Sequence, residues 1–316
     1  MNIDFFFYSE ICRISNLGLG TDSPRLQWKA CDLEDLSAVR NVALELLAQS
    51  ELRLDAVVCN AAVYGPHTPS ELRARHDQVA VETGTEAREE LTAEPAQPEL
   101  TLRVNHLSHA LLAMLLLERL QESSGRLVVV ASSLYKRADA QLMLSLLAGS
   151  PALPSQPLPD QTLYAASKLA QCLFAQAFAR QAGSSIHVSC VHPGLVNTGL
   201  GRYALQRMRP AFLRPAARFL ASLLLRDPAV AAQPVVELAA GLEDRVAESS
   251  SASCALFAHS RTSDPEKSTL ALEQWLPPAD DPSRADTVYR ATSDLLAKLS
   301  LLPPDAGPTP PDLCRA

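Results

Sequence analysis

Short apolar runs alternate along this chain with longer segments in which apolar residues recur every three or four positions. The runs LDAVVCNAA, GRLVVVASS and SIHVSCVHPG predict short strands, most clearly buried in GRLVVVASS. Helices are predicted for LSAVRNVALELLAQ, for LTLRVNHLSHALLAMLLLERLQ and for the segment that begins TLYAASKLAQ. Because strands alternate with long helices, the pattern predicts βαβ units and an α/β fold, with a parallel sheet covered by helices on both faces.

The same pattern predicts how the 316 residues are organised. A single domain is expected over residues 1–302. The segment 67–99 is polar, acidic and interrupted by prolines, which is typical of a surface insertion. The proline-rich end of the chain, residues 303–316, is predicted to be a disordered tail.

Composition and charge narrow the classes of function. The net charge is -7 and no basic stripe appears, which argues against a nucleic-acid partner. The 7 cysteines are scattered, without a C-x-x-C pair or a His/Cys cluster, which predicts a reduced intracellular protein without structural zinc. No apolar run is long enough to predict a membrane-spanning helix, and the opening MNIDFFFYSEI lacks the features of a signal peptide.

Tyr164 and Lys168 are four positions apart, so a helix places both side chains on one face. An unperturbed tyrosine has a pKa of about 10, and a positive charge about 4 Å away contributes roughly 4 kcal/mol at an effective dielectric constant of about 20. Lys168 is therefore expected to lower the pKa of Tyr164 toward the range needed for proton transfer at neutral pH. Composition alone gives a Y-x-x-x-K pattern with a chance of roughly one in ten, so its meaning depends on its neighbours.

Ser132 and Ser133 end the buried run VVVASS, at the edge where open parallel sheets bind ligands. A serine at this place either caps the following helix or holds a substrate oxygen, and the pattern leaves both readings open. Together with Tyr164 and Lys168, the pair forms a combination that is much more specific than either motif alone.

The combination VVVASS…YAASK…VHPGLVNTGLG resembles the short-chain dehydrogenase/reductase superfamily over roughly residues 26–300. The long spacing between serine and tyrosine, and the sequence SSLYK, are more narrowly similar to its retinol dehydrogenase-like branch. The resemblance implies a Rossmann-type doubly wound sheet. It also implies a nicotinamide-dependent oxidoreductase that interconverts a lipophilic alcohol and its aldehyde or ketone.

In that family a tyrosine is the acid/base, and a lysine lowers its pKa and binds the nicotinamide ribose. A serine orients the substrate carbonyl, and an asparagine in the long helix completes a proton relay. The resemblance assigns these roles to Tyr164, Lys168, Ser133 and Asn105, with Ser133 preferred over Ser132 because the family's serine is the second of the pair. For Asn105 the alternative is an ordinary helix-interior residue that makes a local hydrogen bond.

The resemblance also implies a cofactor site for NADP, with NAD as the second candidate. Asp32 in CDLED would contact the adenine, or would cap the next helix, and the Pro-Gly pair in HPGLVNT would either shape the nicotinamide pocket or form a generic turn. The cofactor-binding residues implied in this way are Asp32, Leu33, Asn60, Ala61, Ala62, Tyr164, Lys168, Pro193, Gly194 and Thr198.

The glycine-rich turn that would bind the cofactor pyrophosphate is incomplete in this sequence. SNLGLGTD offers Gly18 and Gly20, but the first expected glycine falls at Ile14, and no helix of about ten residues fits before RLQWKACDL. The sequence therefore predicts an incomplete first βαβ unit and weakened cofactor binding. Three interpretations stay open: a truncated or spliced form of an active enzyme, a diverged enzyme, and a catalytically silent relative that acts as an interaction protein.

The segment LGRYALQRMRPAFLRPAARFLASLLLRDPA mixes arginine with apolar residues at roughly helical spacing. It is either an ordinary amphipathic helix pair or a basic, apolar lid that rests on a membrane surface through residues 202–226. Its apolar character favours a small lipophilic alcohol or carbonyl substrate, such as a retinoid, a steroid or a fatty aldehyde. The expected location is cytoplasmic, including the surface of a membrane such as the endoplasmic reticulum, and a homodimer is left open by the resemblance.

Overall fold

The computed structural model describes residues 4–7, 26–64, 98–149, 158–194, 196, 226–241, 254–259 and 270–302, and only the backbone of 4–7 and 26–28. The segments outside these ranges include most of the predicted surface insertion, the predicted tail at 303–316, and the predicted lid up to residue 225. The glycine-rich sequence around Gly18 and the implied cofactor residue Thr198 also lie outside the described residues.

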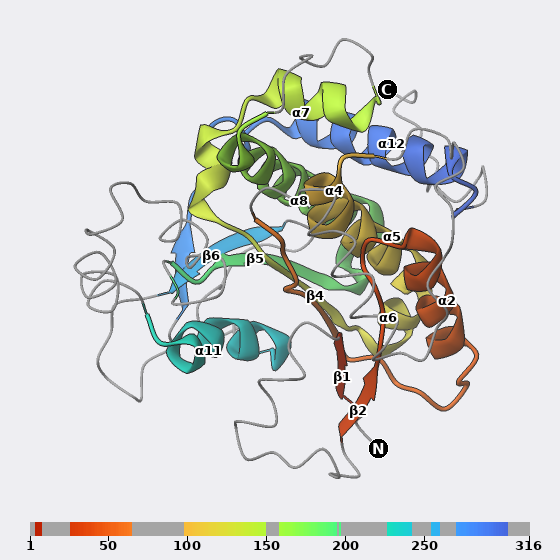
Figure 1. The fold of residues 1–316 in the computed structure, drawn as a ribbon. Helices are drawn as coiled ribbons and strands as arrows, with labels where there is room; N and C mark the ends of the chain where they lie inside the picture. The colour runs from red at the N-terminus through yellow and green to blue at the C-terminus, as the bar shows by residue number, and fades with distance from the viewer. Residues whose placement is uncertain are drawn as a thin grey trace, which may run out of the picture.

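A five-stranded sheet with the order β3-β4-β5-β6-β7 forms the centre of the fold (Figure 1). Its strands are β3 (Ala56–Cys59), β4 (Arg126–Val130), β5 (His187–His192), β6 (Ala255–His259) and β7 (Leu270–Glu273). The pairs from β3 to β6 are parallel, whereas β7 runs antiparallel to β6. The predicted parallel sheet is therefore confirmed, and the reversed last strand is a feature that the sequence pattern did not indicate.

The strands β1 (Asp4–Phe7) and β2 (Leu26–Lys29) pair in parallel and form a separate two-stranded sheet (Figure 1). Among the described residues, neither strand pairs with β3. Because residues 8–25 are not described, the predicted incomplete first βαβ unit stays a prediction.

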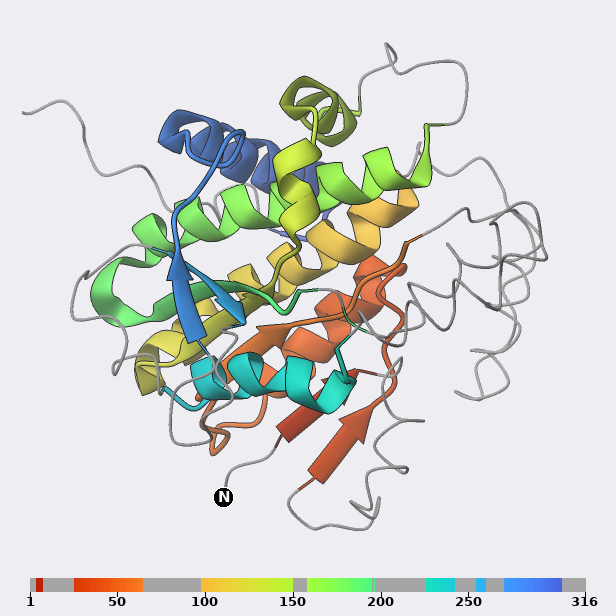
Figure 2. The ribbon, with the colours of Figure 1, turned by 90° about the vertical axis from the view of Figure 1, so that its left-hand side faces the viewer.

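Helices cover both faces of the five-stranded sheet, with α11 on one face and α2, α5 and α8 on the other (Figures 1 and 2). Helix α12 packs on the outside of α8 (Figure 2). The α-helices are α2 (Leu36–Leu47), α4 (Leu100–Leu102), α5 (Ser108–Leu115), α6 (Leu117–Ser123), α7 (Ala140–Leu147), α8 (Asp160–Ala182), α11 (Pro228–Ala239) and α12 (Pro282–Lys298). The described residues also form one π-helix, η3 (Arg103–Leu107), and two 3-10 helices, η4 (Ser133–Arg137) and η5 (Gly183–Ser185).

Strand β4 shows why the apolar run RLVVV becomes a central strand. Side chains alternate between the two faces of a strand, so Leu127 and Val129 join the larger core beneath α8, while Val128 and Val130 join the smaller core beneath α11. Both faces of the strand are thus covered by helices, as the continuous apolar run predicts.

Helix α8 is buried on almost every side, because its many alanines let neighbouring elements approach closely. Every residue from Tyr164 to Ala179 is buried, including Lys168 and Gln171. The helix ends at Ala182, and the capping residue Gly183 has a φ of 66°, in the region that favours glycine. Polar side chains on this helix therefore lie in a water-poor interior, where their pKa values shift and their hydrogen bonds are costly to lose.

The predicted long helix LTLRVNHLSHALLAMLLLERLQ is divided into α4, η3, α5 and α6. The π-helix η3 contains Asn105, and a bend of 57° separates the pieces on either side of Leu116. π-Helical segments occur frequently at functional sites. Among the described helices, none by itself has the length and apolar character needed to cross a membrane, although this bent pair has both when taken together.

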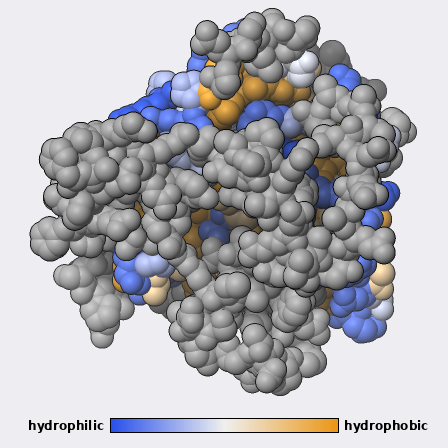
Figure 3. Space-filling model, in the orientation of Figure 1, coloured by the Kyte–Doolittle hydropathy of each residue, from blue (hydrophilic) through white to orange (hydrophobic). Residues whose placement is uncertain are grey.

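Hydrophobic residues of the described part reach the surface only locally in the view of Figure 3, notably near its top, where Figure 1 shows α7. In α7, Leu142 and Leu144 are partly buried and pack against the main core. The apolar face of α7 is therefore largely used in packing within the domain.

Candidate functional site

The residues singled out by the sequence gather at the carboxyl ends of β3, β4 and β5. Asn60 follows β3, Ser132 follows β4 and Pro193 follows β5, while α8 brings Tyr164 and Lys168 to the same edge. The carboxyl ends of parallel strands are the edge at which open α/β sheets bind ligands. The structure thus places the candidate residues where a ligand site is expected.

The serine in contact with Tyr164 is Ser132. Its side chain lies near enough to Tyr164 to lower the pKa of the phenol, and its Oγ accepts a hydrogen bond of 3.3 Å from the Leu134 N–H at the start of η4. Ser132 continues the extended backbone of β4, whereas Ser133 begins the 3-10 helix and its side chain is exposed. This arrangement differs from the preference for Ser133, because the change from strand to helix falls between the two serines.

Tyr164 is buried, and its burial raises the pKa of the phenol to about 12. The nearby Ser132 opposes this increase, and the nearby Tyr64 adds to it. The rings of Tyr64 and Tyr164 meet edge to face, with centroids 5.1 Å apart and planes at 68°. Tyr164 is therefore protonated at neutral pH.

Lys168 does not lower the pKa of Tyr164 as the helical spacing suggested. Its Nζ lies 5.6 Å from the centroid of the Tyr164 ring and donates hydrogen bonds to Val130 O at 2.9 Å and Gln171 Oε1 at 2.8 Å. The sequence could place both side chains on one face of a helix, but it contained no information about these two competing acceptors. Burial lowers the pKa of the Lys168 ammonium to about 8.

Asn105 holds the segment that follows β3 against α8. Its Oδ1 accepts a hydrogen bond of 2.8 Å from the Val63 N–H, and its Nδ2 donates hydrogen bonds of 3.0 Å to Val63 O and to Ser167 Oγ. The side chain is fully buried. These are bonds between distant parts of the chain, so the alternative of a local hydrogen bond within the helix is not what the structure shows.

The implied cofactor residues next to Val63 differ in exposure. The Asn60 side chain is exposed, while Ala61 and Ala62 are partly buried. Because Asn105 fixes both backbone groups of Val63, the segment that contains these three residues has a defined position at the edge of the sheet. Sequence reasoning missed Tyr64, although its place two residues after the run LDAVVCNAA, at the carboxyl end of a predicted strand, is a signal that could have found it.

Asp32 does not cap α2. Its Oδ1 accepts a hydrogen bond of 2.9 Å from the Glu34 N–H in the preceding turn, and Asp35 is the residue that caps the helix, by accepting bonds from the N–H groups of Ser37 and Ala38. The alternative role of Asp32 as the helix cap is therefore wrong by three positions. Leu33, the next implied cofactor residue, is partly buried against the main core.

The Pro-Gly pair forms a turn after β5. Arg226 Nη1 donates a hydrogen bond of 3.1 Å to Pro193 O, and Gly194 has a φ of +82°. A Cβ at position 194 would also lie 3.3 Å from Arg226 Nη1, so glycine suits this turn in both conformation and space. Arg226, the last residue of the predicted lid, was not singled out from the sequence.

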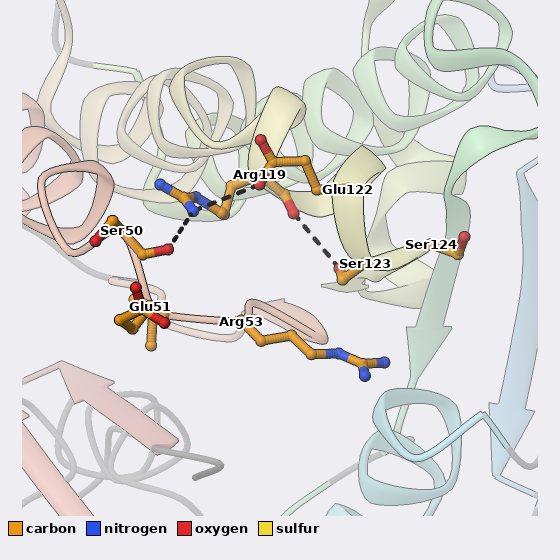
Figure 4. Close-up of a pocket in the computed structure, with 8 residues that line it drawn as sticks. Ser50, Glu51, Arg53, Arg119, Glu122, Ser123 and Ser124 are labelled. Carbon is orange, nitrogen blue, oxygen red and sulfur yellow. Dashed lines mark hydrogen bonds and ion pairs between the residues drawn. The ribbon is translucent and has the colours of Figure 1, made fainter.

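A hollow of about 380 Å³ lies at the opposite, amino ends of β3 and β4 (Figure 4). The Arg119 guanidinium beside it donates hydrogen bonds to Leu47 O and Ser50 O, at 3.1 and 3.2 Å. This arginine holds the loop after α2 in place, so its guanidinium is already engaged with the protein rather than offered to a ligand in the hollow. Its lining residues are Ser50, Glu51, Leu52, Arg53, Arg119, Glu122, Ser123 and Ser124.

A family model and several curated proteins match parts of this chain. A family model described as short chain dehydrogenase matches residues 149–208. Protochlorophyllide reductase from Avena sativa is 39% identical over 104 residues, which are 32% of this chain and 26% of that protein. The chloroplastic protochlorophyllide reductase A of Arabidopsis thaliana is 36% identical over 104 residues, 32% of this chain and 20% of that protein. The chain thus spans only about a quarter or less of these relatives.

Two solved structures share the fold. A short-chain dehydrogenase/reductase from Saccharomyces cerevisiae has a TM-score of 0.51 at 15% identity, with 90% of this chain and 88% of that chain covered. An uncharacterized protein from Mycobacterium paratuberculosis has a TM-score of 0.53 at 18% identity, with 93% of this chain and 83% of that chain covered. At such low identity the likeness shows a common fold, and none of these matches singles out the retinol dehydrogenase-like branch.

Proposed function

We propose that the chain is a member of the short-chain dehydrogenase/reductase superfamily and acts as an NADP-dependent oxidoreductase that interconverts a lipophilic alcohol and its aldehyde or ketone. NAD is the second candidate cofactor. The observation that carries the proposal is the contact between the Tyr164 and Ser132 side chains at the carboxyl edge of the parallel sheet. Two hydroxyl groups that meet at this edge can bind one substrate oxygen together.

In the proposed reaction, the Tyr164 hydroxyl donates its proton to the carbonyl oxygen, and the Ser132 hydroxyl donates a hydrogen bond to the same oxygen. The nicotinamide, when bound, supplies the hydride for the carbonyl carbon. Since burial raises the pKa of Tyr164 to about 12, the phenol is fully protonated at neutral pH and can act as this donor. The reverse reaction needs the phenolate, the form that burial of Tyr164 disfavours.

Lys168 fits the proposed role of binding a ribose hydroxyl. An ammonium group has three protons to donate, and the structure gives two of them to Val130 O and Gln171 Oε1. One proton is left for a ligand. The segment fixed by Asn105 and the turn at Pro193 and Gly194 would border the nicotinamide end of the cofactor, and Asp32 and Leu33 would lie toward the adenine.

The substrate class is proposed from sequence character and from the relatives. The apolar segment 202–226 supports a lipophilic substrate such as a retinoid, a steroid or a fatty aldehyde, and the names of the curated relatives add protochlorophyllide to the compounds worth testing. We also retain, as proposals, the peripheral membrane contact of this segment and a homodimer. A cytoplasmic location, including a membrane surface, agrees with both.

A catalytically silent interaction protein is the second candidate function. It is favoured by the separate pairing of β1 with β2, which leaves no described strand beside β3. In the doubly wound strand order 3-2-1-4-5-6, the strand at that place leads into the phosphate-binding turn. The two candidates differ in one measurable property, because only the first requires turnover.

An assay of NADPH consumption with retinal, a steroid ketone, a long-chain aldehyde and protochlorophyllide tests the proposed function. We expect turnover with at least one compound, a roughly hundredfold lower kcat/KM for Ser132→Ala, and a change below about twofold for the matched variant Ser133→Ala. Turnover that is lost in Ser133→Ala and kept in Ser132→Ala would reverse the assignment of the serines. Absence of turnover with every compound, from a folded chain that binds NADPH, would favour the silent interaction protein.

A further inference from the structure

Lys168 is the first of three buried polar side chains in a row, and the proposed reaction gives no role to the other two, Gln171 and His109. Gln171 Oε1 lies 2.8 Å from Lys168 Nζ, and Gln171 Nε2 lies 2.9 Å from His109 Nδ1. The three residues are 1%, 2% and 7% exposed, so water does not replace these contacts easily. Lys168 and Gln171 come from α8, whereas His109 comes from α5, 62 positions earlier in the sequence than Gln171.

The direction of each hydrogen bond in this row follows from the chemistry of lysine. An ammonium group only donates, so the Gln171 amide must turn its oxygen toward Lys168 and its NH₂ group toward His109. The Nδ1 atom of His109 therefore accepts, and its proton is on Nε2. Burial lowers the pKa of His109 to about 3, which agrees with a neutral ring in this role.

We propose that Gln171 and His109 are positioning residues that hold the Lys168 ammonium at the carboxyl end of β4. His109 fixes the orientation of the Gln171 amide, and the amide oxygen, together with Val130 O, fixes Nζ. Without His109, the amide could rotate by half a turn and present its NH₂ group to the ammonium. The proposal rests on the proposed function only in giving the held ammonium a use, because the contacts themselves involve no cofactor or substrate.

The ionisable groups around Lys168 are uncharged, so the ammonium is held by hydrogen bonds to uncharged groups. Cys59 from β3, Cys172 from α8 and Cys190 from β5 act on Lys168, and Tyr164 lies one turn away on α8. Burial raises the pKa of Cys59 to about 12, and the pKa of Cys190 is raised by its hydrogen bonds with Cys172 and Cys254 and by burial, so both thiols are protonated. His109 from α5 and His106 from η3 are neutral, since burial lowers the pKa of each to about 3.

The pKa of Lys168, measured by NMR on the full chain with ¹³C at lysine Cε, tests the proposal without cofactor or turnover. The sequence has five lysines, Lys29, Lys136, Lys168, Lys267 and Lys298, so the signals can be assigned by single replacement. Gln171→Leu removes a charge-assisted acceptor and should lower the Lys168 pKa by about one pH unit or more. Gln171→Glu places a carboxylate beside the ammonium and should raise it.

The two His109 variants separate positioning from simple packing. His109→Asn keeps an acceptor near the place of Nδ1 and should leave the Lys168 pKa close to that of the parent chain, whereas His109→Leu should lower it. If Gln171→Leu fails to fold, Gln171→Asn, which shortens the side chain by one methylene, should lower the pKa in the same direction. An unchanged pKa in the Gln171 variants, or equal values in His109→Asn and His109→Leu, would overturn the proposal.

Turnover gives the second readout. If the parent chain reduces a carbonyl substrate, Gln171→Leu should lower kcat by about tenfold or more and shift the pH profile in the same direction as the Lys168 pKa. Shifted Lys168 pKa values in a chain without turnover would support the positioning role and contradict the proposed function. Turnover with unchanged Lys168 pKa values in all variants would support the proposed function and contradict the positioning role. The failure of one claim can therefore be told from the failure of the other.

Discussion

Replacing Tyr164 with phenylalanine is expected to lower kcat by about 10²- to 10⁴-fold while leaving NADPH binding within about twofold. The phenol is the proton donor in the proposed reduction, and phenylalanine keeps the ring that packs against Tyr64 while removing only the acidic hydroxyl. The hydroxyl contacts Ser132, so its loss leaves a small polar gap at the edge of the sheet rather than a cavity in the core. Single-turnover kinetics with the best substrate of the panel, alongside an NADPH titration, measures both quantities.

Tyr64→Phe is the matched control for this prediction. It removes a hydroxyl from the neighbouring ring, which raises the pKa of Tyr164 but does not take part in the proposed proton transfer. Turnover should therefore stay within about tenfold of the parent chain. A Tyr164→Phe variant that retains the turnover of the parent would show that another group donates the proton.

Acid should destabilise the fold between pH 6.5 and about 3, because two buried histidines stay neutral when folded. Burial lowers the pKa values of His106 and His109 from 6.5 to about 3. As the pH falls below 6.5, the unfolded chain takes up protons at both positions and the folded chain does not, so the free energy of unfolding decreases. At pH 4.5 the expected loss is roughly 3 kcal/mol for each histidine relative to pH 7.

Urea unfolding at pH 7 and at pH 4.5 measures this loss, and histidine variants isolate it from the titration of carboxylates. His109→Asn should reduce the difference between the two pH values by roughly 3 kcal/mol, because asparagine does not titrate. His187→Asn, at an exposed residue that begins β5, serves as the control and should change the difference little. Equal pH dependence in the parent chain and in His109→Asn would contradict the burial of a neutral ring.

The fold could be predicted from the sequence wherever burial determines the pattern. The run RLVVV predicts a central strand because both of its faces are covered, and the structure confirms this in the two cores that meet at β4. The reversed β7 could not be predicted, since the direction of a strand depends on the path of the preceding connection. The π-helix η3 and the bend at Leu116 could not be predicted either, because the apolar spacing of the long segment continues without interruption.

The candidate site shows the same limit at the level of single atoms. Helical spacing correctly places Tyr164 and Lys168 on one face, but the partners of Lys168 are the carbonyl oxygen of Val130 and the amide of Gln171. The choice between Ser132 and Ser133 depended on where extended backbone gives way to a 3-10 turn, which is a difference of one residue. The contact of His109 with Gln171 joins two helices that are distant in sequence, and one sequence contains no signal for such a pair.

A fluorescence titration of the purified 316-residue chain with NADPH and NADH tests whether the chain binds a nicotinamide cofactor at all. The proposed function predicts saturable binding with a dissociation constant on the order of micromolar, tighter for NADPH than for NADH. Binding of this strength would mean that the first 31 residues provide a phosphate site despite the missing glycine at Ile14. No binding at millimolar cofactor, by a chain shown to be folded, would contradict the proposed activity and leave Tyr164, Lys168 and Ser132 as remnants of an ancestral site.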